Sequence, residues 1–274
     1  MLNCAITVII VNYNSTAFVE LNLFALDLLT KNPFKVIICD NGSKEQEKAK
    51  LKLIVNKYEN VELIFRQQTH EGSIGHGEAL NILTAKIDTK YGVILDADAV
   101  LLIAGWDEIL INELDDITKI IGTPPVSGNI KPTDFPLMYA ILFETESFKK
   151  LAIDMRPKDI SKGQDTGWEM REKYLNANLK AKVLIAQNTR DYKKGFFGKF
   201  LCAEYYHEKY SHIFACHFGR GSTAGKAKYK AGNIFLKLPG LEGVYKKIKS
   251  QKEKKQWISL CRQIIDKELV NEVR

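Results

Sequence analysis

Two carboxylates one residue apart follow an apolar run in the segment YGVILDADAV, residues 91–100. If the chain is extended there, Asp96 and Asp98 point to the same side, because strand side chains alternate with a period of two. Two like charges on one edge repel each other, so they are tolerated at a solvated strand end or around a cation. By itself, the segment fits the cap of a helix starting near Ala104 as well as a metal site.

Polar residues also follow two other apolar runs. Asn12 and Asn14 come after the run 6–11, and Asp-Asn-Gly-Ser at 40–43 comes after the run 36–39. In open α/β sheets, ligands bind outside the carboxyl ends of the strands. We therefore expect these polar residues and the two carboxylates to share one ligand-binding edge.

The elements that would build this edge alternate between strand and helix patterns. The apolar runs are short and rich in Val and Ile, as in strands that are buried on both faces of a parallel sheet. The expected strands are residues 6–11, 36–39, 61–65 and 93–95, and the expected helices are residues 17–30, 45–58, 78–87 and 106–114. The pattern predicts a layered α/β domain.

The second half of the sequence is less regular. We expect a strand over 137–143, a helix over 164–179 and a further strand over 183–186. A glycine-bearing segment, GRGSTAG, then leads into a lysine-rich tail.

Composition indicates a globular protein of a reducing compartment. Of the 274 residues, 45% are hydrophobic and 10% aromatic, which is enough for a sizeable core. The five cysteines are odd in number and include no CxxC pair, so we expect reduced thiols. The first residues have no basic leader before their apolar run, which fits neither a secretory signal nor a membrane span. The expected location is the cytoplasm.

The net charge of +7 is concentrated in the last part of the chain. From Tyr192 onward there are 18 basic against 7 acidic residues. Such a tail suits nucleic acid, an anionic membrane surface or substrate phosphates, and it equally suits a solvated helix face.

Two nucleotide-binding fingerprints are absent. The glycines of EGSIGHGEALN have the wrong spacing for GxGxxG and do not follow the first strand. In GRGSTAGKA, the P-loop pattern would need glycine at Arg220 and Ser or Thr at Ala227. An NAD-linked oxidoreductase and a P-loop NTPase are therefore not expected.

Four segments in order, AITVIIVNYNS, VIICDNGS, SIGHGEALN and YGVILDADAV, resemble the successive blocks of GT-A glycosyltransferases, most closely the family 2 group. The resemblance covers about the first 115 residues well and the rest loosely. It implies an α/β GT-A fold with a mainly parallel central sheet flanked by helices. The implied catalytic domain is 1–225, with a nucleotide-sugar-binding half (1–118) and an acceptor-binding half (119–225). A basic C-terminal extension (226–274) follows it.

The implied reaction moves a sugar from a nucleotide-diphosphate donor, a UDP-sugar first, to a hydroxyl of a saccharide, glycolipid or other acceptor. Surface polysaccharide or glycolipid synthesis is the implied setting, and no nucleic acid partner is expected. The resemblance assigns donor binding to Val11, Asn14, Asp40, Gly75, Asp96 and Arg220. Asp40 would accept a hydrogen bond from the uracil ring N–H, although Asp-Asn-Gly-Ser is also good turn and cap chemistry.

The same resemblance implies a divalent cation, Mn²⁺ or Mg²⁺. Asp98 would be a direct ligand, Asp96 would face the ribose or the ion through water, and His217 would bind metal or phosphate. Such an ion neutralises the charge that develops on the departing nucleoside diphosphate. Arg220 would pair with the diphosphate. His217 is equally readable as structural, as we expect for the other histidines, His70, His76, His207 and His212.

An inverting transfer also needs a general base, and the family places it in an acidic motif of the second half. The matching segment is KGQDTGWEM, which makes Asp165 the base and Trp168 a wall of the acceptor site. Gln164 departs from the family pattern, which commonly has an acid there. Asp165 could instead cap a helix running from Thr166, with Glu169 as the substitute base.

Three further alternatives stay open. The apolar residues between Lys226 and Lys255 could lie on an anionic membrane face, which would suit a lipid-linked acceptor, or pack back on the domain. A sugar-nucleotide nucleotidyltransferase should show a glycine-rich, basic phosphate loop, and VNYNSTAF has neither glycine nor lysine. A degenerate GT-A binding module without activity is kept open by Gln164.

Overall fold

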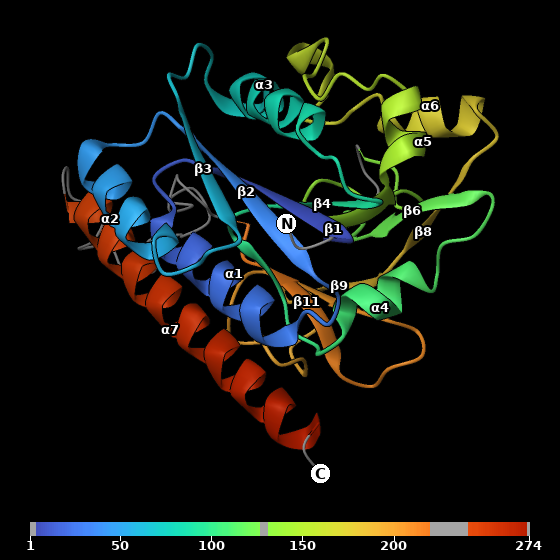
Figure 1. The fold of residues 1–274 in the computed structure, drawn as a ribbon. Coiled ribbons are helices and arrows are strands. Elements are labelled where there is room, and N and C mark those ends of the chain that lie inside the picture. Colours follow the sequence, from blue (N-terminus) through green and yellow to red (C-terminus); the bar gives the residue numbers. More distant parts are fainter. Residues whose placement is uncertain (1–3, 127–130, 220–240, 273–274) are drawn as a thin grey trace.

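The structure is a computed structural model that describes residues 4–126, 131–219 and 241–272 (Figure 1). Strands and helices alternate through the first half, as expected. The strands are β1 (Ile6–Asn12), β2 (Phe34–Asn41), β3 (Val61–Arg66), β4 (Tyr91–Leu95), β5 (Ala99–Leu101), β6 (Thr118–Gly122), β7 (Ala140–Glu144), β8 (Lys180–Val183), β9 (Ile185–Asn188), β10 (Ala203–Tyr206) and β11 (Ile213–His217). The helices are α1 (Thr16–Leu29), α2 (Glu45–Val55), α3 (Gly72–Ala85), α4 (Trp106–Ile111), α5 (Thr145–Lys150), a 3₁₀ turn (Ile160–Lys162), α6 (Met170–Asn176) and α7 (Leu241–Glu272).

The central sheet has seven strands in the order β3-β2-β1-β4-β7-β6-β8. The four strands of the first half are parallel to one another, β7 is antiparallel to both of its neighbours, and β6 and β8 are parallel. The sheet is therefore mainly parallel, and the carboxyl ends of β1, β2 and β4 open on one edge. This is the expected α/β architecture.

Alternate residues of the central strands feed two apolar layers. In β1, Val8 and Ile10 pack into a cluster with α1, α2, α4 and α7, whereas Ile9 packs into a cluster with α3, α5 and α6. Figure 1 shows these helix groups on opposite faces of the sheet. Burial on both faces explains why these strands are apolar throughout rather than alternating.

A second sheet, in the order β5-β11-β10-β9, extends the first cluster. Helix α7 lies along α1 and closes this side of the domain (Figure 1). Its residues Trp257, Cys261 and Ile265 are fully buried, and the Trp257 ring meets those of Phe18 and Phe218. The second half of α7 thus packs on the domain, beyond the segment 226–255 for which the two alternatives were stated. No helix among the described residues is both long and apolar enough to cross a membrane.

Three elements differ from the sequence prediction. Helix α3 begins at Gly72, six residues before the expected start, because Gly75 and Gly77 are places of close packing rather than a turn. A Cβ on Gly77 would lie 2.7 Å from the Arg156 Cα. The helix expected over 164–179 shrinks to α6, since Gly167 has a φ of +72° and interrupts it. The strand expected over 183–186 is split, because β8 and β9 belong to different sheets.

Candidate active site

A cavity of about 500 Å³ lies at the carboxyl ends of β1, β2 and β4. Its walls come from both halves of the chain. Val11 and Asn41 end the first two strands, Asp96 and Asp98 follow the third, and Asp165 reaches in from the second half. The expected ligand edge is therefore a real hollow of the molecule, as ligand sites in such sheets are.

The two carboxylates lie on a tight turn rather than on a strand. β4 ends at Leu95, and the Ala99 N–H donates to the Asp96 carbonyl over 3.0 Å. The Asn22 side chain of α1 donates to the carbonyl of Ala97, which fixes the turn from below. The strand thus stops before the charges, as the sequence requires, and the turn rather than strand alternation aims both acids. The helix that follows is capped by Gly105, not by either Asp.

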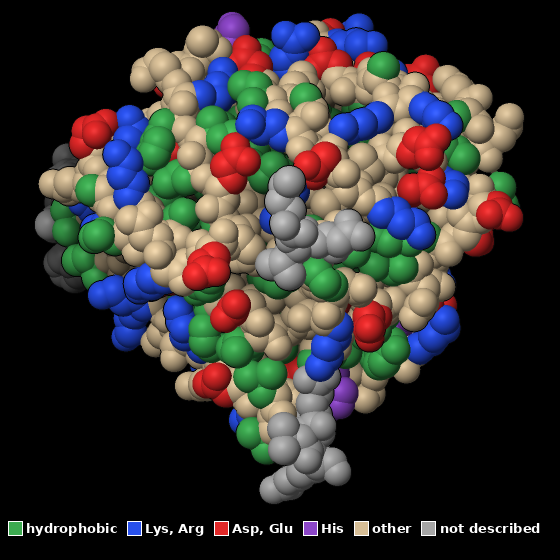
Figure 2. Space-filling model, viewed as in Figure 1, with side chains coloured by type: hydrophobic (Ala, Val, Ile, Leu, Met, Phe, Trp, Pro, Cys, Tyr) green, Lys and Arg blue, Asp and Glu red, His purple; other side chains and the backbone are tan. Residues whose placement is uncertain are grey.

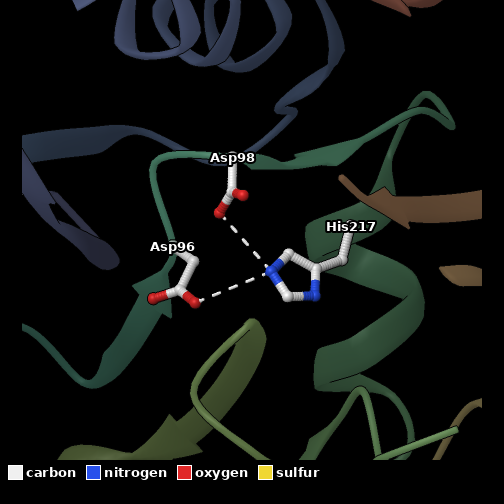
Figure 3. A group of neighbouring side chains, drawn as sticks. All are labelled: Asp96, Asp98 and His217. Atoms are coloured by element: carbon white, nitrogen blue, oxygen red, sulfur yellow. Dashed lines mark ion pairs between the residues drawn. The ribbon is translucent and has the colours of Figure 1, made fainter. Parts of the chain in front are cut away.

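The second sheet brings His217 to these acids (Figure 3). In the β5–β11 pairing His217 lies opposite Ala99, and its ring stacks on Tyr139 with centroids 4.1 Å apart. Its Nε2 lies 3.4 Å from Asp98 Oδ1 and 3.9 Å from Asp96 Oδ2. One ligand atom from each of the three residues lies within 4.8 Å of the others.

The electrostatics of this cluster favour a cation. Burial raises the pKa of Asp96 well above its ordinary value, the charges of Asp98 and Asp165 raise it further, and Lys131 opposes them. Two carboxylates and an imidazole form a donor set that suits Mn²⁺ and also accommodates Mg²⁺. These residues fit a divalent ion, which would relieve the repulsion that the protein otherwise leaves in place.

His76 of α3 also belongs to this site, although we expected it to be structural. Its Nε2 lies 3.6 Å from Asp96 Oδ1, and its Nδ1 lies 3.4 Å from the Thr166 hydroxyl. Burial lowers its pKa, against the opposing charges of Asp165 and Asp98. In the sequence, the only indication of a role for His76 is that it lies in SIGHGEALN, one of the four segments that resemble the family.

Asp165 lines the same cavity and is held by three donors. It accepts from Lys131 Nζ at 2.5 Å, from the Ser73 hydroxyl and from the Thr166 N–H at 2.9 Å. Burial by itself raises the pKa of Asp165, but the hydrogen bonds and the Lys131 charge outweigh it and hold the pKa below its ordinary value. Helix α6 begins only at Met170, so Asp165 is not its cap. Sequence patterns gave no indication of Lys131, whereas Ser73, like His76, lies in a resemblance segment.

The sequence profile described as glycosyl transferase family 2 matches residues 7–179, well over half of the chain. The chain belongs to glycosyl transferase family 2. The resemblance stated from the four segments is thereby confirmed, together with glycosyl transfer as the reaction class of the family. The nucleotidyltransferase alternative is not supported.

Solved structures similar to this family 2 glycosyltransferase include mannosyltransferase PcManGT from Pyrobaculum calidifontis, in complex with GDP-Man and Mn²⁺. The TM-score is 0.52 at 16% identity, over 66% of this chain and 55% of that one. S. aureus TarS 1-349 in complex with UDP matches with a TM-score of 0.48 at 17% identity, over 69% and 62% of the two chains. The chain thus spans less than two thirds of these proteins, and the likeness concerns the fold. No curated protein matches.

The remaining donor residues named from the sequence are spread unevenly around this glycosyltransferase's cavity. Val11 and Asp96 line it, whereas Asn14, Asp40 and Gly75 do not. Asp40 is fully buried and accepts from Asn12 Nδ2 at 2.7 Å and from the Ser43 N–H at 3.0 Å. One oxygen thus accepts within the turn and the other accepts from the end of β1.

Asn14 has a φ of +52°, and its side chain accepts from the Lys44 N–H at 3.0 Å, so it ties the first two strand ends together. Gly75 is buried in α3, where a Cβ would strike the His70 carbonyl. Its own carbonyl accepts from Asn41 and Arg66. Arg220 lies outside the described residues.

Trp168 lines a second cavity of about 400 Å³, which shares Asp165, Thr166, Lys131 and Leu137 with the first. Its side chain is 37% exposed, which leaves a ring face for a ligand. Glu169, the substitute base, accepts from the Asp154 N–H and pairs with Lys158 and Lys173. Asp165, not Glu169, faces both cavities.

Proposed function

We propose that this protein transfers a sugar from a nucleoside-diphosphate donor to an acceptor hydroxyl, with inversion and with the help of a divalent cation. The observation that carries the proposal is the convergence of Asp96, Asp98 and Asp165 on one cavity of a family 2 chain, with His217 beside the first two acids. A site for a cation and an ionised carboxylate beside one cavity are what a metal-assisted displacement requires.

Asp96, Asp98 and His217 would hold a Mn²⁺ or Mg²⁺ ion beside the donor diphosphate. When bound, the ion supplies Lewis-acid stabilisation of the leaving nucleoside diphosphate. Lys131 brings a further positive charge to the same cavity, and its hydrogen bond keeps its ammonium group at Asp165. Val11 shapes the nucleoside end, with Asp40 and Asn14 holding the turns that it depends on.

Asp165 is the general base of the proposed reaction. Its pKa, held low, keeps it ionised at neutral pH and ready to accept the acceptor's hydroxyl proton. The acceptor oxygen then bonds to the anomeric carbon as the bond from that carbon to the diphosphate oxygen breaks. The adjoining cavity with Trp168 is the acceptor site, because a sugar ring stacks on an indole face and the shared wall is Asp165 itself.

The donor is proposed to be a UDP-sugar, as the sequence resemblance implies. GDP-mannose is the competing donor, since it is bound by the mannosyltransferase of similar fold. The acceptor is proposed to be a saccharide or glycolipid of surface polymer synthesis, reached from the cytoplasm at an anionic membrane surface. This setting agrees with the excess of basic residues in the last part of the chain.

A donor screen tests the proposal. UDP-, GDP- and dTDP-sugars, each with Mn²⁺, Mg²⁺ or EDTA, are compared by thermal stabilisation and by slow donor hydrolysis. We expect one nucleotide class to raise the melting temperature only with the metal present. Failure of every donor with both metals would refute the donor site. Donor binding without hydrolysis or transfer to any acceptor would favour the inactive binding module.

A further inference from the structure

The first half of α7 differs from the buried second half in both charge and exposure. Between Val244 and Lys255 the sequence has six lysines and one glutamate. Val244 and Ile248, one helical turn apart, are 55% and 63% exposed. Figure 2 shows Lys and Arg side chains gathered along α7 and over α2, at the left of the view. Scattered exposed apolar residues are ordinary, but apolar tips set among lysines are not.

A groove connects this part of α7 to α2. It has a volume of about 510 Å³ and is lined by Gln251 and Lys255 of α7 and by Lys50 and Leu53 of α2. Leu53 is 69% exposed, the most exposed large apolar side chain among the described residues. Ile248 precedes Gln251 by one helical turn on the same side, so the apolar tips of both helices flank one basic face.

We propose that this face, formed by Lys50, Leu53, Val244, Lys247, Ile248, Lys252 and Lys255, docks on an anionic lipid bilayer. The lysines face lipid phosphates, and the three apolar tips enter the headgroup region. Lys254 lies in the groove over the Phe18 ring, 4.2 Å from its centroid, and Glu20 and Glu47 also line the groove, with Glu47 paired to Lys50. The excess of positive charge therefore comes from the exposed lysines of α7. A rigid platform results, because Trp257 and Cys261 fix the next turns of α7 in the core.

The position of the groove connects docking to catalysis. Asn14 and Thr16 line the groove, whereas Tyr13 and Ser15, their neighbours in the chain, line the donor cavity. Residues of one short loop thus line both the groove of the proposed bilayer face and the donor cavity. This inference rests on the proposed function only in naming a lipid-borne acceptor, and docking itself is measured without any donor.

Co-sedimentation with vesicles tests the proposal. The full chain should bind phosphatidylcholine vesicles containing phosphatidylglycerol, bind pure phosphatidylcholine much more weakly, and be released by high salt. Removing two lysines in Lys247→Gln/Lys252→Gln should weaken binding about 30-fold, since each lysine near an anionic surface contributes about 1 kcal/mol. Leu53→Ser/Ile248→Ser should also weaken binding and leave its salt dependence in place.

The matched control is Lys267→Gln/Val270→Ser, which makes the same kinds of change at exposed positions at the other end of α7. It should bind as the unchanged protein does, and the melting temperature of every variant verifies folding. Equal losses in the control, or binding to heparin with none to vesicles, would overturn the proposal. Metal-dependent donor stabilisation, measured without vesicles, separates failure of docking from failure of the proposed function.

Discussion

The two acidic centres of the cavity are built on opposite principles. Asp96 and Asp98 face each other with histidines nearby, and burial and mutual repulsion raise the pKa of Asp96. Asp165 lines the same cavity, but a lysine and two further donors hold its pKa low. The charges around Asp96 therefore disfavour its ionised form, whereas the charge of Lys131 favours the ionised form of Asp165.

The difference teaches which role each centre can take. A carboxylate that the protein already keeps ionised is suited to accept a proton, and it needs no cation from solution to do so. A pair of carboxylates that repel each other is suited to a cation that arrives with the substrate. The experiments below separate the two centres, beginning with the largest expected effect.

Asp165→Asn should lower the transfer rate about 100- to 10,000-fold, because the general base is lost. Donor and metal binding should change little, since the amide retains much of the contact with Ser73. Initial rates with the identified donor and acceptor, together with donor thermal shifts, measure both quantities. The control is Asp159→Asn, a carboxylate of the same segment that caps a local turn and pairs with Lys162. Unchanged turnover in Asp165→Asn would remove Asp165 from the mechanism.

Asp98→Asn should lower the rate about 100- to 1,000-fold, as for loss of a main electrostatic element of the transition state. Unlike Asp165→Asn, it should also abolish the stabilisation by Mn²⁺ and donor. Metal titrations followed by melting temperature provide the measurement. Asp116→Asn, at an exposed site, is the matched change. Full activity of Asp98→Asn in EDTA would contradict a metal-dependent reaction.

Lys131→Met should move the acidic limb of the kcat/KM profile to higher pH. The active form of Asp165 is ionised, so the rate falls as pH falls through its pKa, which Lys131 now holds low. Without the lysine, burial remains and the pKa rises. Profiles are recorded at saturating metal. Lys119→Met, which breaks a partly buried pair with Glu144 elsewhere, should leave the limb in place. If the acidic limb does not move in Lys131→Met, then the limb does not report the ionisation of Asp165.

His76→Gln should give the smallest effect, a loss of about tenfold in Mn²⁺ affinity, because His76 touches Asp96 rather than the ion. His212→Gln, at an exposed histidine, should leave the affinity unchanged. Metal titration in the presence of donor compares the two. An effect of His76→Gln as large as that of Asp98→Asn would instead place His76 among the ligands.

The sequence predicts the first half of the fold well, for a physical reason. Strands buried on both faces are continuous apolar runs, so the expected strand at 6–11 matches β1 within one residue. The second sheet is harder to predict because two of its strands, β5 and β10, carry no distinct run of this kind. β5 is three residues inside a longer apolar stretch, and β10 contains a buried acid, Glu204, that accepts from Phe197 and Tyr206.

The site shows the same division. The sequence identifies three candidate acids, Asp96, Asp98 and Asp165, because they lie at a strand end or in a family motif. The sequence does not predict a role for Lys131, since it lies in a loop and its role depends on its contact with Asp165. His76 was set aside because a lone histidine in a sequence is more often structural. Contacts between distant segments, not residue types, supply this missing part.

The pairing of β11 with β5 has a consequence for the order in which the protein matures. Asp96 and Asp98 are synthesised over a hundred residues before His217, and only the antiparallel register of these two short strands brings the imidazole to them. Such a long-range pairing forms late. A nascent chain that already has its first parallel strands therefore lacks the third side chain of the cluster. Full affinity of the proposed metal site should thus appear only once translation has passed β11.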